Sequence, residues 1–70
     1  MKYAIVIEKA ENNYSAYAPD VPGCAAVGDT LEEVQREMQS AIEFHIEGLR
    51  EVGQTIPEST TDCGYVEIAV

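Results

Sequence analysis

Residues 28–53, GDTLEEVQREMQSAIEFHIEGLREVG, predict one long helix and thereby decide the fold class. Thr30 and Glu33 match a capping box, in which the threonine hydroxyl accepts from the Glu33 N–H and the glutamate reaches back toward the helix start. Gly53 suits the position just after the helix, and Pro57 opposes its continuation. Side chains that recur at helical spacing form one stripe for packing against a sheet: Leu31, Val34, Met38, Ala41, Ile42, His45, Leu49 and Val52.

Three short strands are predicted before this helix. Residues 2–9 alternate in character with the period of two that strands impose. A polar turn at residues 11–13 separates them from a second strand at 14–18, so the two are expected to form an antiparallel hairpin. Two prolines and a glycine at residues 19–23 force a bend, and residues 24–27 then resume as a third strand.

A fourth strand is predicted after the helix, at residues 63–70. The order strand, strand, strand, helix, strand predicts an α+β fold of two layers, a β-β-β-α-β arrangement in which one helix covers one face of a mixed sheet. The helix would join the third and fourth strands, which run parallel, in a right-handed crossover. The uncovered face of the sheet would be too apolar for full solvation, which predicts a contact surface; it would carry Ala4, Val6, Tyr17, Val27 and Tyr65.

Length and charge restrict the classes of function. We expect residues 1–70 to form a single domain, and a chain this short buries only about 60% of its unfolded surface, so a homo-oligomer, dimer or tetramer, is predicted. Thirteen acidic residues against four basic ones give a net charge of −9. This charge opposes direct binding of nucleic acid, which depends on Lys and Arg contacts to phosphate, and favours a basic partner. Charge alone leaves open that the glutamates serve solubility.

The sequence contains no recognisable catalytic, cofactor or metal motif. Cys24 and Cys63 form no CxxC pair, and the carboxylates do not follow the pattern of a two-metal nuclease. His45 lies in the helix stripe and is interpreted as a packed residue, the alternative being a catalytic base beside a thiol. The start of the chain lacks the features of a signal peptide and no apolar run could span a bilayer, so we expect a cytoplasmic protein without enzymatic activity.

Several motifs, taken together and in order, resemble the HicB-type antitoxin family. They are YAPDVPGC at 17–24, GDTLEE at 28–33, AIE at 41–43 and GQTIP at 53–57. The resemblance covers about residues 3–57 and implies a degraded ribonuclease-H-like sheet with one helix. It also implies a partner, a small basic HicA-like toxin that cleaves mRNA. Family members often repress their own operon through a C-terminal DNA-binding segment, which we expect this chain to lack after Val70.

The leading hypothesis is therefore a type II antitoxin that binds and neutralises a HicA-like toxin. The alternative is an orphan HicB-like oligomeric binding module without a toxin, and a residual hydrolase is a third. Phe44 lies off the helix stripe among glutamates, which makes it a candidate contact anchor. The other predicted partner-binding residues are Tyr17, Asp20, Glu43, Glu47 and Tyr65.

Overall fold

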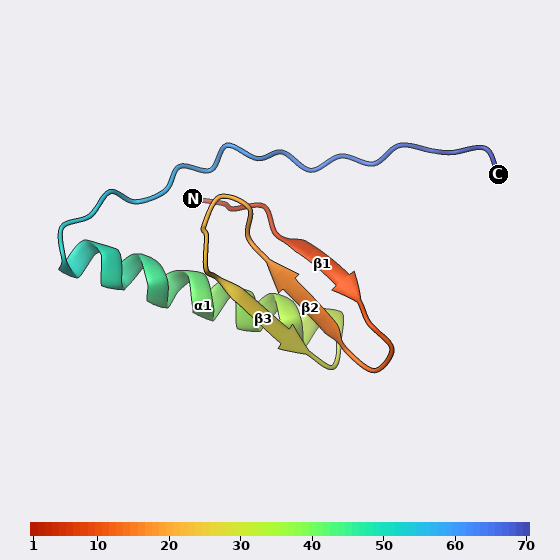
Figure 1. The fold of residues 1–70 in the computed structure, drawn as a ribbon, viewed down its shortest axis with the longest axis horizontal. Coiled ribbons are helices and arrows are strands. Elements are labelled where there is room, and N and C mark those ends of the chain that lie inside the picture. The colour runs from red at the N-terminus through yellow and green to blue at the C-terminus, as the bar shows by residue number, and fades with distance from the viewer.

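The computed structural model describes residues 1–70 and has two layers, a three-stranded sheet and one helix (Figure 1). The strands are β1 (Val6–Lys9), β2 (Tyr14–Tyr17) and β3 (Ala25–Gly28), and α1 (Leu31–Glu51) follows them. The helix lies across one face of the sheet. The predicted α+β class with one helix on one sheet face is confirmed.

The sheet has the order β1-β2-β3, and both pairs are antiparallel. The hairpin predicted for the first two strands is therefore confirmed. Ile7, Ala16 and Ala26 lie in one cross-strand row on the face that packs against α1. The next row, Val6, Tyr17 and Ala25, consequently points to the uncovered outer face, because successive side chains alternate between faces.

The hydrophobic core is small and built largely from short side chains. Seven hydrophobic residues are buried, and the largest fully buried side chains belong to Met38, Val21 and Val34. Such a core is marginal for a chain of this length, as small domains bury a low fraction of their surface. The seven are Ala16, Ala18, Val21, Cys24, Val34, Met38 and Ile42.

Both predicted ends of the helix are confirmed. The Thr30 hydroxyl oxygen accepts from the Glu33 N–H at 3.1 Å, and the Glu33 carboxylate accepts from the Asp29 N–H, one residue before the cap. At the other end Gly53 adopts φ +73°, and its N–H donates to the Arg50 carbonyl. The Gln54 N–H donates to the Leu49 carbonyl at 2.9 Å, which completes a Schellman motif.

A close approach of β3 to the helix requires glycine at position 28. A Cβ atom built on Gly28 would lie 2.7 Å from the Val34 backbone nitrogen, a distance that forces the backbone to move. Gly28 is itself buried, and β3 makes the most extensive packing with α1 of the three strands. Gly28 therefore allows β3 and the start of α1 to pack in close contact.

The predicted fourth strand is wrong. Residues 54–70, named here the C-terminal tail, contain no strand, and the sheet is antiparallel throughout rather than mixed. No hydrogen bond between two backbone groups involves a residue after Gln54. Alternating side chains make residues 63–70 suitable for a strand, but a strand also needs a neighbour for its backbone groups, and this chain alone supplies none at that position.

The predicted helix stripe is correct at its centre and wrong at its ends. Val34, Met38 and Ile42 are buried, whereas Leu31 and Val52 are exposed. At the Val52 end the helix extends beyond the sheet (Figure 1). Ile46, absent from the predicted stripe, is partly buried against the core. The helix is not apolar enough along its length to cross a membrane.

Candidate interaction surfaces

Asp20 fastens the C-terminal tail to the loop between β2 and β3. Its Oδ2 accepts from the backbone N–H groups of Thr60 and Thr61, both at 2.8 Å. Its Oδ1 accepts from the Thr61 hydroxyl at 2.7 Å and from the Thr60 hydroxyl at 3.1 Å. These bonds hold the pKa of the Asp20 carboxyl below its ordinary value of 3.8, and the bond from the Thr61 hydroxyl contributes most.

A second contact fastens the tail closer to the helix. The Tyr3 hydroxyl donates to the Pro57 carbonyl at 2.6 Å. Together with the Asp20 bonds, it fixes the path of the tail from the end of α1 to Thr61. Beyond Thr61 no side-chain hydrogen bond to the rest of the chain is present.

The outer face of the sheet carries a shallow apolar hollow. Six residues of β2 and β3 line it, and Tyr17 and Val27 are its most exposed large side chains. Tyr17 lies on this uncovered face as its strand period predicts. The hollow is lined by Ser15, Ala16, Tyr17, Ala25, Ala26 and Val27.

A second hollow lies between the start of β3 and the C-terminal half of α1. Phe44 lies at this hollow with 80% of its surface exposed. Gly48 keeps it open, since no atom lies within 4 Å of the position where a Cβ would be. Ala25 lines both hollows, so they meet at β3 and form one continuous region, named here the β3-edge surface.

The second hollow also contains Cys24 and His45, but their arrangement is not that of a nucleophile and its base. Cys24 is buried, its thiol donates to the Ala41 carbonyl at 3.8 Å, and burial raises the pKa of this thiol. No hydrogen bond joins Cys24 to His45. A raised pKa favours the protonated thiol over the nucleophilic thiolate. No group of three or more His, Cys, Asp or Glu side chains is placed to hold a metal ion.

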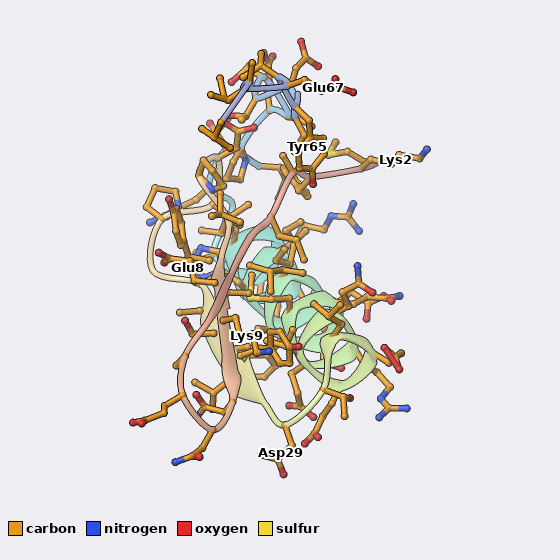
Figure 2. All side chains as sticks on the ribbon, turned by 90° about the vertical axis from the view of Figure 1, so that its right-hand side faces the viewer. Lys2, Glu8, Lys9, Asp29, Tyr65 and Glu67 are labelled. Carbon is orange, nitrogen blue, oxygen red and sulfur yellow. The ribbon has the colours of Figure 1, made fainter.

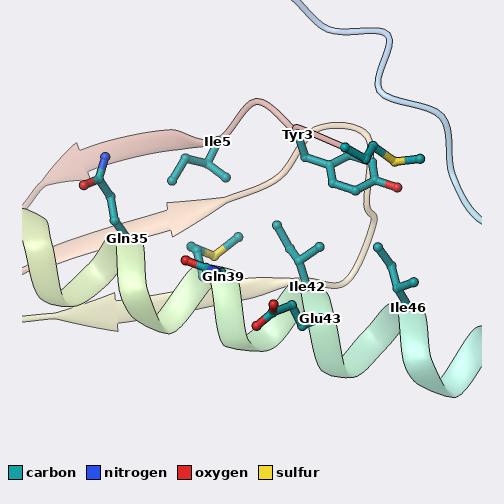
Figure 3. A pocket seen from close by; sticks show the side chains of 9 residues that line it. Tyr3, Ile5, Gln35, Gln39, Ile42, Glu43 and Ile46 are labelled. Atoms are coloured by element: carbon teal, nitrogen blue, oxygen red, sulfur yellow. The ribbon is translucent and has the colours of Figure 1, made fainter.

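A third hollow of about 330 Å³ lies between the N-terminal segment and α1 (Figure 3). Tyr3 and Ile5 face Ile42 and Ile46 across it. It is named here the N-terminal hollow. The helix packs on β3 and β2 and hardly on β1, which leaves this side of the core open. Sequence reasoning missed it, and the helical position of Ile46, four residues after Ile42, was the available signal.

The six predicted partner-binding residues do not form one surface. Tyr17 and Phe44 lie on the two sides of the β3-edge surface, and Glu47 is on the exposed side of α1, one turn after Phe44. Glu43 lines the N-terminal hollow instead. Asp20 is occupied by the tail.

Tyr65 is not on the uncovered sheet face, which corrects the prediction. It lies in the tail, fully exposed, beside a groove between residues 4–7 and 61–65 (Figure 2). Its predicted position depended on the fourth strand, which is absent. Ala4 likewise precedes β1 and lines this groove.

Comparison with known proteins gives one family and several relatives. The sequence profile of the family described as "HicB_like antitoxin of bacterial toxin-antitoxin system" matches residues 3–67. An uncharacterized 14.9 kDa protein from the rep-hol intergenic region of Haemophilus phage HP1 is 48% identical over 66 residues, covering 94% of this chain and 50% of the phage protein. The chain thus spans half the length of that relative.

Smaller relatives are matched over more of their own length. A UPF0150 protein of Synechocystis is 37% identical over 57 residues, which are 80% of this chain and 72% of that protein. A UPF0150 protein of Archaeoglobus fulgidus is 42% identical over 48 residues, 67% of this chain and 70% of that protein. No solved structure matches the chain.

Proposed function

Since this chain belongs to the HicB-like antitoxin family of bacterial toxin–antitoxin systems, we propose that it binds and neutralises a small basic HicA-like toxin that cleaves mRNA. The observation that carries the proposal is the family match over residues 3–67, which includes every strand and the helix. A toxin of this kind acts where mRNA is, so the proposal places the chain in the cytoplasm. The chain itself would catalyse no reaction.

Charge supports a basic partner. The chain has a net charge of −9, and the helix alone contributes six glutamates against two arginines. A protein that binds RNA presents Lys and Arg to phosphate, and carboxylates on a folded surface complement the same positive face. The glutamates of the helix are Glu32, Glu33, Glu37, Glu43, Glu47 and Glu51.

The β3-edge surface supplies the apolar part of such an interface. Exposed Phe44 and Tyr17 flank the free edge of β3, and Gly48 leaves room beside Phe44 for a partner side chain. Protein interfaces commonly place aromatic anchors at the centre and charged groups at the rim. Glu47 follows Phe44 by three residues and so lies on the same face of the helix. We propose this surface as the toxin-binding site.

The test is to look beside this gene for a reading frame that encodes a small basic protein and to co-express that protein with the chain; the absence of such a reading frame would count against the proposal. The wild-type chain is expected to rescue growth from the toxicity of that protein and to be recovered with it in a pull-down. Phe44→Ala is expected to abolish rescue. Val52→Ala, which also removes an exposed apolar side chain from the helix end but lies outside the β3-edge surface, is expected to retain it.

Two results would contradict this proposal. A neighbouring protein that is harmless or that does not bind would leave the chain as an orphan HicB-like binding module. Rescue that Phe44→Ala leaves intact would place the toxin on another surface.

A further inference from the structure

We propose that residues 65–70 form a β-strand on the free edge of β1 in a second copy of this chain, and that two copies exchange these segments reciprocally. The occupant of the β1 edge is thus the C-terminal tail of another identical chain. This inference does not rely on a toxin and is independent of the proposed function.

The segment has the pattern of a strand but no partner for its backbone or its side chains. Val66, Ile68 and Val70 alternate along it, and all three are largely exposed. None of its backbone groups makes a hydrogen bond within the chain. An extended segment that exposes apolar side chains on one side and unpaired N–H and C=O groups along its edges is suited to strand addition.

The free edge of β1 lacks the neighbouring strand that this segment could supply. β1 pairs with β2 on one side only, so its other edge presents unpaired backbone groups. On the same side the core is open, because the N-terminal hollow of about 330 Å³ separates Ile5 from Ile46. A strand added beside β1 would turn every second side chain toward this hollow. Valine and isoleucine at alternate positions meet that requirement.

The chain does not fill its own edge. The bonds that the Asp20 carboxylate accepts from Thr60 and Thr61 hold the tail near β1, where residues 61–65 and 4–7 line a groove of about 360 Å³ without pairing. Beyond this groove the tail continues past the sheet while β1 turns away from it (Figure 1). Each copy therefore presents a vacant β1 edge and one projecting strand. Two identical chains related by a two-fold axis can pair the projecting segment of each chain with the vacant β1 edge of the other.

Charge on the two elements is also complementary. The N-terminal segment and β1 carry Lys2 and Lys9, half of the basic residues in the chain, against one acidic residue, Glu8, and the projecting segment carries Glu67 (Figure 2). Two copies with a net charge of −9 each repel at long range. Lysines at the β1 edge give the acidic tail a local contact of opposite sign.

The first experiment measures the dimer dissociation constant by analytical ultracentrifugation of the full chain over a concentration series. Ile68→Lys is expected to raise this constant about tenfold or more, as loss of a central apolar contact does in other interfaces. Val52→Lys is the matched control, because Val52 and Ile68 are both 69% exposed and the two substitutions change the charge equally. A wild-type chain that stays monomeric, or a dimer equally stable in both variants, would overturn the proposal.

The second experiment asks whether the segment pairs within or between chains. Val70→Cys and Glu8→Cys are combined with Cys63→Ser, so that the one remaining native thiol, Cys24, is buried. Treatment with a bismaleimide is expected to give a covalent dimer on a denaturing gel. A cross-linked monomer instead would show that the tail closes on its own β1, and the exchange would be refuted even where Ile68→Lys impairs folding.

Discussion

Among single residues, Asp20 makes the largest number of hydrogen bonds to residues far away in the sequence. A half-buried aspartate at the bend after β2 accepts four hydrogen bonds from residues 40 and 41 positions later. No other side chain makes as many hydrogen bonds to the tail, and the only other such bond comes from Tyr3. The attachment of Thr60 and Thr61 therefore depends on the ionised form of one carboxyl group.

Acid is expected to release the tail from Asp20. The pKa of this carboxyl is below 3.8 in the folded chain, so the stabilisation by these bonds is complete above pH 3.8 and is lost as the pH falls through the lower folded value. The amide shifts of Thr60 and Thr61, followed by NMR, should titrate with a midpoint below 3.8. In Asp20→Asn both should be insensitive to pH in this range. A midpoint at or above 3.8 in the native chain would contradict the observed bonding.

The helix cap at Thr30 gives a second prediction for a single residue. Thr30→Ala leaves the Glu33 N–H without its side-chain acceptor and should lower the free energy of unfolding by on the order of 1 kcal/mol. Thr30→Ser keeps the hydroxyl and should change it much less. The measurement is the midpoint of chemical denaturation. Equal midpoints for Thr30→Ala and the native chain would mean that this bond contributes nothing.

Among the elements, α1 contributes side chains both to the hydrophobic core and to the exposed surface. Val34, Met38 and Ile42 close the core, while Phe44 and the glutamates on the other side face solvent. The helix is therefore both the main packing element and the proposed carrier of toxin contacts. Its two sides can be altered independently, because residues on opposite sides of a helix share few neighbours.

Substitutions on the exposed side of α1 should separate the association rate from the dissociation rate. Glu43→Lys with Glu47→Lys should mainly slow association with a basic toxin and weaken its dependence on salt, since exposed charges steer encounter. Phe44→Ala should mainly speed dissociation, since a packed aromatic anchor acts after encounter. Surface plasmon resonance at two ionic strengths measures both rates. A Phe44→Ala variant that dissociates as slowly as the native chain would remove Phe44 from the interface.

At the scale of the whole molecule, charge is the dominant property. Thirteen acidic and four basic residues surround a core of seven buried hydrophobic residues. So small a core leaves much of the chain's apolar surface, including the tail and the outer sheet face, for contacts with other molecules.

The 70-residue chain alone is expected not to bind DNA at physiological salt. Its net charge of −9 repels phosphate, and its four basic residues are spread over the N-terminal segment, β1 and two turns of α1. A gel-shift experiment with the DNA upstream of its own gene is the test. Specific retention of that DNA by these 70 residues without a partner would show that the charge argument fails.

The sequence predicted the features that depend on neighbours a few residues apart. The Thr30 cap, the Gly53 cap and the hairpin between β1 and β2 are all as expected, because caps and short turns are closed by groups within about five residues of one another. Family motifs at 17–24 and 28–33 likewise indicated the family that the profile match confirms. Phe44 was correctly placed off the packed stripe by helical spacing alone.

Only the tertiary structure decided the course of the tail and which side of the core stays open. Residues 63–70 have the alternation of a strand, yet a strand exists only where another backbone lies beside it, and alternation carries no information about that neighbour. The bonds between Asp20 and Thr61 join groups 41 residues apart and depend on how helix and sheet meet. Local pattern determined which segments could pair, and packing across the whole chain determined which of them do.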